Sequence, residues 1–209
     1  MEEGYKTILT SEEVSIVVKR SKFIGNIEYV KNKDEAVGFY KEIKEKYKDA
    51  THNVVAYIIK SSGITYCTDD KEPHGTAGKP ILDILKKSDI FDVCVVVTRY
   101  FGGVLLGTGG LCYSYSSCCK EILKRATFAR CCLCEILKLE FSYKNLNKIE
   151  NIISAYNITK LEKQYVEDVH FLVVVEEKKS KSFENASMEA TNGDVKINCI
   201  KKEWQRIKF

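Results

Sequence analysis

The spacing of apolar and polar positions predicts alternating strands and helices over the first 125 residues. Apolar side chains at every second position, or in short unbroken runs, are typical of strands. Such strands are expected at residues 16–18, 23–30, 53–59, 64–67 and 93–98. The run Val93–Thr98 is rich in β-branched residues, which indicates a strand buried on both faces.

Apolar residues at helical spacing predict helices between and after these strands. They are expected at residues 33–47, 79–87 and 108–125. Asn32 with Glu35 three residues later has the pattern of a capping box. Pro80 is tolerated in the first turn of the second helix, and Thr108 is predicted to cap the third. This order favours a two-layer α/β domain, in which the helices cover one face of a sheet.

The pattern changes after about residue 130. Strands are expected at residues 135–141, 158–166, 169–176 and 195–204, and helices at 145–156 and 179–190. Asn192-Gly193 is a turn signal before the last strand. The resulting β-α-β-β-α-β order is typical of a ferredoxin-like domain. We therefore expect an α+β chain with a boundary near residues 129–134, dividing it into domains 1–130 and 131–209.

Composition excludes several classes of protein. An apolar fraction of 44% suits a folded core, and a net charge of +4 is too small to indicate a nucleic-acid partner by itself. The start Met1-Glu2-Glu3 is unlike a secretory signal, and no apolar run approaches the roughly 18 residues of a membrane span. We expect a cytoplasmic protein without a membrane partner. Its nine cysteines are then expected to be reduced and mostly buried, since their number is odd.

The segment Asp69–Gly110 carries the candidate chemistry, because two glycine clusters flank an apolar strand that ends at Arg99. Glycines let backbone amides approach a ligand, and amides presented before a helix form an anion site. The predicted anion-binding or nucleic-acid-binding residues are Lys79, Arg99, Tyr100, Phe101, Gly102, Gly103, Gly107, Thr108, Gly109 and Gly110. The motif loop beside them contains Asp69, Asp70, Glu72, His74, Gly75, Thr76 and Gly78.

The same segment resembles the signature of a known family. EPHGTAGKP followed by VVVTRYFGGVLLGTGGL is similar to the central motif of the Impact/YigZ family. The pieces SKFIG (21–25) and ATHNVVAY (50–57) also match the family's pattern, and the resemblance covers nearly the whole chain. One position departs from the bacterial members, which usually have a basic residue where this chain has Tyr113. If that cation contacts a phosphate, this chain lacks one such contact.

The resemblance has implications for fold and function. It implies an N-terminal domain of the ribosomal-protein type, shared with the GHMP small-molecule kinases and with a domain of elongation factor G. It implies a C-terminal domain similar to the ferredoxin-like end domain of that factor. Eukaryotic members act in translational control by binding a ribosome-associated regulator of a stress kinase. Nucleic-acid or ribosome binding is the usual inference for bacterial members, and some carry a dipeptidase label.

Each candidate residue also has a structural alternative. Arg99 and Lys79 either bind phosphate or form ion pairs with the nearby acids. Tyr100 and Phe101 either stack on bases, or one ring is core and the other covers it. The glycine loop either holds an anion or only allows close packing. Its Gly-Thr-Gly-Gly sequence is only similar to the nucleotide-binding loop of metabolite kinases, which argues against phosphoryl transfer.

Two kinds of metal chemistry are alternatives to binding. A metal-dependent hydrolase, dipeptidase-like, would use the acidic and histidine residues of the loop 67–74 with His52. Cys131 and Cys134 have CxxC spacing, and Cys118 and Cys119 precede them, but a zinc site would need a second pair at similar spacing. We expect no metal and no cofactor. The favoured interpretation is a non-enzymatic cytoplasmic factor that binds RNA or a ribosome-associated partner and modulates translation, of unknown oligomeric state.

Overall fold

The computed structural model describes residues 4–165 and 167–208, and shows a mixed α+β fold of two compact units. The N-terminal unit comprises Tyr5–Arg130 and the C-terminal unit Cys131–Ile207, and they are described separately below. The expected α+β class with two domains is confirmed. That each domain folds independently stays a prediction.

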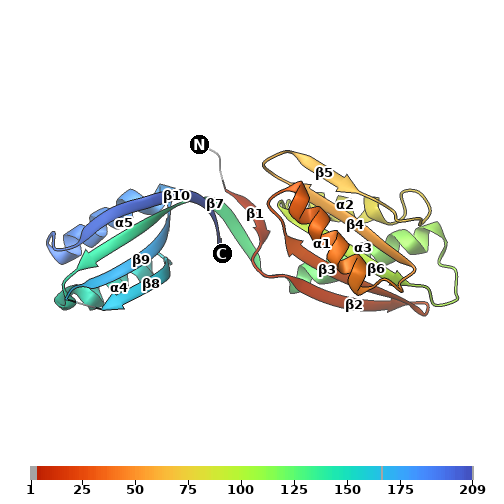
Figure 1. Cartoon of the computed structure of the whole chain (residues 1–209), viewed down its shortest axis with the longest axis horizontal. Helices are drawn as coiled ribbons and strands as arrows, with labels where there is room; N and C mark the ends of the chain where they lie inside the picture. The colour runs from red at the N-terminus through yellow and green to blue at the C-terminus, as the bar shows by residue number, and fades with distance from the viewer. Residues whose placement is uncertain (1–3, 166, 209) are drawn as a thin grey trace. The chain divides into compact units, whose positions relative to one another are not determined.

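An antiparallel sheet with the order β2-β3-β6-β4-β5 forms the centre of the N-terminal unit (Figure 1). Its strands are β2 (Glu12–Val18), β3 (Ser21–Tyr29), β4 (His52–Ile59), β5 (Ile64–Cys67) and β6 (Val93–Tyr100). The β-branched run predicted as a doubly buried strand lies in β6, between β3 and β4. In this register Arg99 is paired with Phe23 on one side and with His52 on the other.

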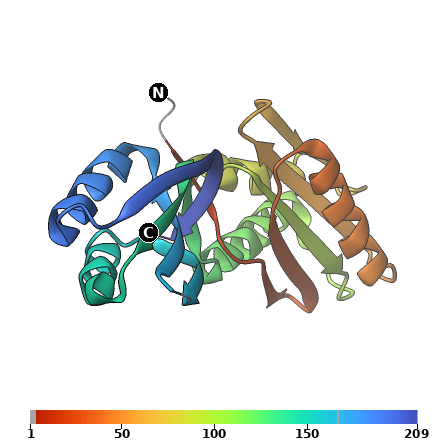
Figure 2. The same cartoon turned by 60° about the vertical axis from the view of Figure 1, so that its left-hand side comes forward.

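Helices cover both faces of this sheet, which corrects the expected two-layer arrangement with helices on one face. The helices are α1 (Lys33–Lys46), α2 (Gly78–Lys87) and α3 (Gly107–Arg125). Val54, Ala56 and Ile58 of β4 pack with residues of α2 and α3, whereas Val55 and Tyr57 pack with residues of α1. Figures 1 and 2 show α1 and α3 on opposite sides of the sheet. The central strands β4 and β6 carry buried side chains at consecutive positions, so each face of the sheet requires its own cover.

The helix caps agree with the sequence pattern in one case and differ in another. Asn32 accepts a hydrogen bond from the Glu35 backbone N–H at 2.9 Å, as expected of the N-cap of α1. Thr108 does not cap α3. The N-cap is Leu106, which makes no side-chain capping bond, and Thr108 lies within the first turn. Gly107, with a φ of 70°, lets the chain turn into the helix one residue before Thr108.

The C-terminal unit has the predicted β-α-β-β-α-β order. Its strands are β7 (Phe128–Phe141), β8 (Thr159–Tyr165), β9 (Val169–Glu176) and β10 (Lys196–Lys208), and its helices are α4 (Leu146–Ala155), α5 (Glu177–Thr191) and the short 3₁₀ helix η1 (Tyr143–Asn145). Strand β9 lies between β7 and β8, and β10 pairs with β7. This is the strand order of a ferredoxin-like sheet. The predicted turn at Asn192-Gly193 ends α5 through backbone bonds to Glu189 and Met188.

The cysteines contribute mainly to packing. None of the nine, all within the described residues, forms a disulfide, and Cys94, Cys118 and Cys119 are fully buried. Burial raises the pKa of the Cys118 thiol to about 12, so it stays protonated at neutral pH. Cys131 and Cys134 are three residues apart on strand β7, so their side chains point to opposite faces and cannot share a metal.

Candidate functional site

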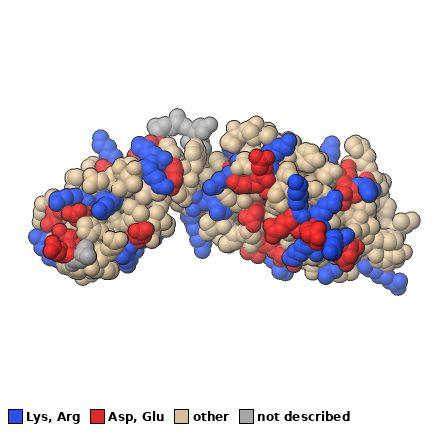
Figure 3. Space-filling view, in the orientation of Figure 1, with Lys and Arg blue, Asp and Glu red and all other residues tan. Residues whose placement is uncertain are grey.

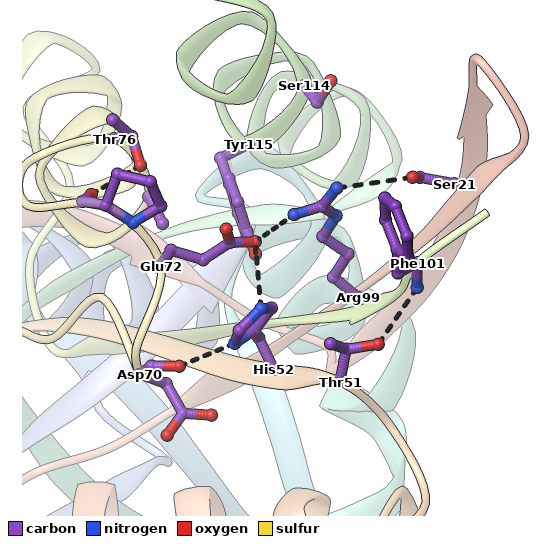
Figure 4. A network of polar contacts seen from close by, with 12 residues as sticks. Ser21, Thr51, His52, Asp70, Glu72, Thr76, Arg99, Phe101, Ser114 and Tyr115 are labelled. Atoms are coloured by element: carbon purple, nitrogen blue, oxygen red, sulfur yellow. Dashed lines mark hydrogen bonds and ion pairs between the residues drawn. The ribbon is translucent and has the colours of Figure 1, made fainter. Parts of the chain in front are cut away.

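The candidate site lies where β6 ends beside the start of β4. The pairing of Arg99 with His52 brings the loop that follows β6 next to the segment that precedes β4. Thr51 fixes this junction, because its N–H donates to the Arg99 carbonyl at 2.9 Å and its Oγ1 accepts from the Phe101 N–H at 3.0 Å. Figure 4 shows these residues together with Glu72 of the motif loop and Tyr115 of α3.

Arg99 and Glu72 form a buried ion pair in this junction. Arg99 Nη1 lies 2.7 Å from Glu72 Oε1, and their side chains are 6% and 3% exposed. The Tyr115 hydroxyl donates to the same oxygen at 2.7 Å. Burial, and then the hydrogen bond to Glu72, raises the pKa of Tyr115 above its ordinary value, so the phenol remains a donor. Of the alternatives for Arg99, the structure thus shows the ion pair with a nearby acid.

His52 connects the ion pair to the motif loop. Its Nδ1 lies 2.7 Å from the Asp70 carbonyl oxygen, which can only accept, so Nδ1 carries a proton. Nε2 is 3.7 Å from Glu72 Oε1. The Asp70 carboxylate accepts the Asn53 backbone N–H at 2.6 Å. His52 and Asp70 therefore hold the start of β4 against the loop.

Asp69 organises the remainder of the motif loop. Its carboxylate accepts backbone N–H groups of Gly75, Ala77 and Gly78 at 2.8–3.1 Å. Burial alone would raise the pKa of Asp69, but these three hydrogen bonds outweigh burial and hold it below its ordinary value. Asp69 therefore fixes the turn that leads into α2.

Two further members of the motif loop have different environments. Thr76 donates through Oγ1 to the Pro73 carbonyl at 2.6 Å, which closes the turn before α2. The His74 side chain is fully exposed, with Nδ1 3.8 Å from Asp69 Oδ2. Thr76 is thus structural, and His74 faces solvent beside the loop.

The glycines have different roles, some of them in packing. A Cβ on Gly102 would lie 2.1 Å from the backbone of Arg20, and one on Gly78 would lie 2.5 Å from the Thr68 carbonyl oxygen. Only glycine fits at these two positions. Gly103 adopts a φ of 82°, which favours glycine in the turn after β6. A Cβ on Gly109 would meet nothing within 4 Å, so packing does not require glycine there.

A cavity of about 430 Å³ opens above the ion pair and is hereafter called the apolar pocket. Its lining residues are Thr51, His52, Glu72, Pro73, Arg99, Phe101, Leu105, Leu106, Gly107, Thr108 and Leu111. Phe101 is 45% exposed and Leu105 is 85% exposed, so the rim presents apolar surface to solvent. The Phe101 ring lies 5.5 Å from the Arg99 guanidinium carbon. This combination of apolar walls and a few converging polar groups is typical of ligand sites.

The structure brings together only part of the predicted site. Arg99, Phe101, Gly107, Thr108 and Glu72 line the apolar pocket. Lys79 is exposed and Gly109 and Gly110 lie in the first turn of α3, but none of the three is among the lining residues. The alternative in which one of the two rings is core is wrong, since neither ring is buried. Tyr100 donates its hydroxyl to Asp49 at 2.8 Å.

The acids required by the hydrolase alternative are bound to groups of the protein. Asp69 and Asp70 accept backbone N–H groups, and Glu72 accepts from Arg99 and Tyr115. Within the described ranges, no group of three or more His, Cys, Asp and Glu side chains is placed to hold a metal ion. The roles of these acids in the loop account for their presence.

A second concave surface, hereafter called the lysine groove, was missed by sequence reasoning. Its volume is about 500 Å³, and it is lined by Lys41, Lys44, Glu45, Lys48, Ala50, Thr51, Asn53, Asp70 and Lys71. Lys41 and Lys44 lie three residues apart on α1, and Lys48 follows just after the helix ends, so the spacing of these lysines is readable in the sequence. Lys71 is added by a turn in which Asp70 and Lys71 have φ values of 42° and 70°. No pattern in the sequence reveals that Lys71 lies beside the lysines at residues 41–48.

Thr51 lines both the lysine groove and the apolar pocket. The groove has four lysines against two carboxylates, and the Lys48–Glu45 pair at 3.7 Å is highly exposed. Among the described residues, Lys41, Lys44 and Lys71 form no ion pair. None of the helices in the described part of the chain is long and apolar enough to cross a membrane.

Comparison with known proteins gives matches to both units. The Impact N-terminal domain matches residues 19–123, and a domain of unknown function, DUF1949, matches residues 139–194. The IMPACT family member YvyE of Bacillus subtilis is 39% identical over 100% of this chain and 99% of its own length. The IMPACT family member YigZ of Escherichia coli is 28% identical over 93% of this chain and 98% of its own.

A solved structure also matches over almost the whole chain. It is a crystal structure of a hypothetical protein, 28% identical, which covers 97% of this chain and 100% of its own with a TM-score of 0.62. The match to the Impact N-terminal domain spans β3, β4, β5 and β6, the motif loop and the glycine loop described above. The resemblance inferred from the central motif is confirmed, and the chain belongs to the Impact family.

Proposed function

We propose that this protein is a non-enzymatic cytoplasmic factor that binds single-stranded RNA, free or within ribosome-associated partners, and thereby modulates translation. The lysine groove is the observation that carries the proposal. Two lysines of α1, a third just after its end and Lys71 of the motif loop line one concave surface that has only two carboxylates. Lysines at such positions neutralise backbone phosphates and release condensed counterions on binding. The translational part of the proposal is supported by membership of a family whose eukaryotic members are expected to act in translational control.

The charge distribution favours weak and salt-sensitive binding. Net charge is only +4, and Figure 3 shows Lys and Arg interspersed with Asp and Glu over the visible face of the N-terminal unit. Phosphate contacts must therefore be few and local. With at most four of them, the logarithm of affinity should fall with the logarithm of salt concentration with a slope of about −3.

Arg99 does not take the phosphate-binding role in this proposal. Its guanidinium is buried and already paired with Glu72, so a phosphate would have to displace a buried ion pair. Lys41, Lys44 and Lys71 are exposed instead, and binding a phosphate there breaks no ion pair among the residues that the structure describes. We therefore propose the lysine groove, and not the glycine loop, as the anion site.

The test compares RNA binding by the unmodified protein with RNA binding by a variant that has fewer lysines in the groove. Lys41→Gln, Lys44→Gln and Lys71→Gln in one chain should weaken binding of a 12-nucleotide oligouridylate by at least about tenfold at 50 mM salt, and should flatten the salt slope by about 2. Fluorescence anisotropy measures both quantities. A matched control carries Lys86→Gln, Lys87→Gln and Lys120→Gln, which remove the same charge from exposed helix positions outside the groove.

The control triple should retain most of the affinity, because only the general attraction of net charge is reduced. Equal losses in the two triples would show that net charge, and not the groove, attracts RNA. Failure of the unmodified protein to bind RNA at low salt would reject the proposed function.

A further inference from the structure

We infer that the apolar pocket is a nucleobase site, which takes one unstacked base of a single-stranded RNA whose backbone lies in the lysine groove. The inference rests on the proposed function and adds to it a base-binding element and a preference for single strands. Its starting point is the shared residue Thr51, which makes the groove and the pocket contiguous. A strand that follows the groove therefore passes the mouth of the pocket.

Phe101 supplies the stacking surface. The ring is 45% exposed at the rim, and the Arg99 guanidinium carbon lies 5.5 Å from its centroid. That contact and the hydrogen bond from the Phe101 N–H to Thr51 hold the residue in place before a ligand arrives. Little side-chain freedom is then lost on binding. Bases stack on exposed aromatic rings largely independently of sequence, which suits a site that recognises a base as such.

Polar groups among the lining residues distinguish a base from an aliphatic side chain. Thr51 and Thr108 line the pocket beside its apolar residues, and their hydroxyls can donate hydrogen bonds. Nucleobases carry carbonyl and ring-nitrogen acceptors, whereas a leucine or phenylalanine anchor of a protein partner carries none.

The adjacent charge supports the same occupant. An apolar anchor alone would not require lysines beside the pocket, but a nucleotide brings a phosphate with each base. The cavity volume of about 430 Å³ lies within the range typical of small-ligand sites, so one base with its ribose fits. Duplex RNA keeps its bases stacked inside the helix and cannot place one there.

The test is a cycle of one protein variant and one ligand variant. The ligands are a 12-nucleotide oligouridylate and a strand of the same length and charge made of abasic ribose phosphates. The unmodified protein should bind oligouridylate about fivefold to a hundredfold more tightly than the abasic strand. Phe101→Leu should bind both strands alike, at the affinity of the abasic strand, with an unchanged salt slope.

Two variants serve as controls for Phe101→Leu. Phe101→Trp should keep the preference for bases, because it preserves a stacking ring. Tyr66→Leu removes another exposed aromatic ring of the same unit that does not line the pocket, and should leave the preference unchanged. If Phe101→Leu fails to fold, the comparison of the two strands on unmodified protein still decides whether a base is recognised.

The outcomes separate this inference from the proposed function. Salt-dependent binding that is equal for both strands would overturn the base site while leaving the lysine groove as an RNA surface. Absence of binding to either strand would reject the proposed function as well. If a glutamate-rich peptide that contains leucines competes as strongly as oligouridylate, the surface belongs to an acidic protein partner. That result would overturn the inference.

Discussion

At the scale of single residues, burial decides what Arg99 can do. The same residue would bind phosphate if exposed, but here it neutralises Glu72 and supports the Phe101 ring. Sequence reasoning identified Arg99 and Glu72 as candidates because both lie in the central motif. The sequence pattern does not distinguish a phosphate site from an ion pair. The distance between Arg99 and Glu72 depends on the pairing of β4 with β6, which no local pattern reveals.

Arg99→Ala should lower the free energy of unfolding by about 3–5 kcal/mol, because it leaves Glu72 as an uncompensated buried charge. Denaturant unfolding followed by far-UV circular dichroism measures the change. The control Lys79→Ala removes an exposed cation and should stay within about 0.5 kcal/mol of the unmodified protein. Equal effects of the two substitutions would contradict the buried ion pair.

Two glycines of the glycine loop should respond in opposite directions to alanine. Gly102→Ala places a Cβ 2.1 Å from the Arg20 backbone and should destabilise the chain by about 3 kcal/mol or more. Gly109→Ala meets no atom within 4 Å and should be neutral or stabilising by up to about 1 kcal/mol, because alanine favours the helix. Thermal melting compares them. Destabilisation by Gly109→Ala would indicate a constraint that the structure does not contain.

At the scale of elements, local sequence patterns predict the features that depend on residues within a single helix or strand. The capping residue Asn32, the β-branched run in β6 and the β-α-β-β-α-β order were all readable from the sequence. The side of the sheet on which α1 packs was not, because it depends on how the chain crosses between strands. Strand β1 (Tyr5–Ile8) was also missed. It has only four residues, and it pairs with the distant strand β7.

The lysine groove shows the same limit. Two of its lysines lie on α1 and a third follows the end of the helix, and their spacing is readable in the sequence, but exposed lysines are common on helices. Lys71 completes the groove. A turn in which Asp70 and Lys71 both have positive φ values places it there. A contact between a helix and a loop about 25 residues further along the chain is set by packing and not by local spacing.

We expect the ionisation of Asp194, which lies between α5 and β10, to affect the stability of the C-terminal unit. Hydrogen bonds from the Ser142 hydroxyl and N–H, and from Asn145, lower the pKa of Asp194 from 3.8 to about 2. A lowered pKa in the folded state stabilises the fold above the unfolded value, and this contribution is lost as pH falls from about 4 to about 2. Asp194→Asn should remove this pH dependence.

Trp204, the only tryptophan, lies in β10 and reports on this unit through its fluorescence. Urea titrations at pH 5, 3.5 and 2.5 should show a decreasing midpoint for the unmodified protein. In the asparagine variant the decrease should be smaller. Parallel curves for both proteins would show that other groups determine the acid sensitivity.

At the scale of the whole molecule, the two compact units have separate apolar cores. We predict that residues 1–130 fold cooperatively when expressed alone, and that the C-terminal unit, near 80 residues, is only marginally stable. In the intact chain the Trp204 transition should then precede the main change in far-UV circular dichroism. Coincident transitions in both probes would indicate that the units unfold together.

The central claim is that RNA lies along the lysine groove and enters the apolar pocket. Backbone amide spectra of the ¹⁵N-labelled protein, titrated with a 12-nucleotide oligouridylate at low salt, test it most directly. The account predicts shifts at Lys41 and Lys44 of α1, at Lys48 after its end, at Lys71, at Thr51 and at Phe101–Leu106, with little change in α2. Shifts confined to the C-terminal unit, or spread evenly over exposed lysines, would contradict it.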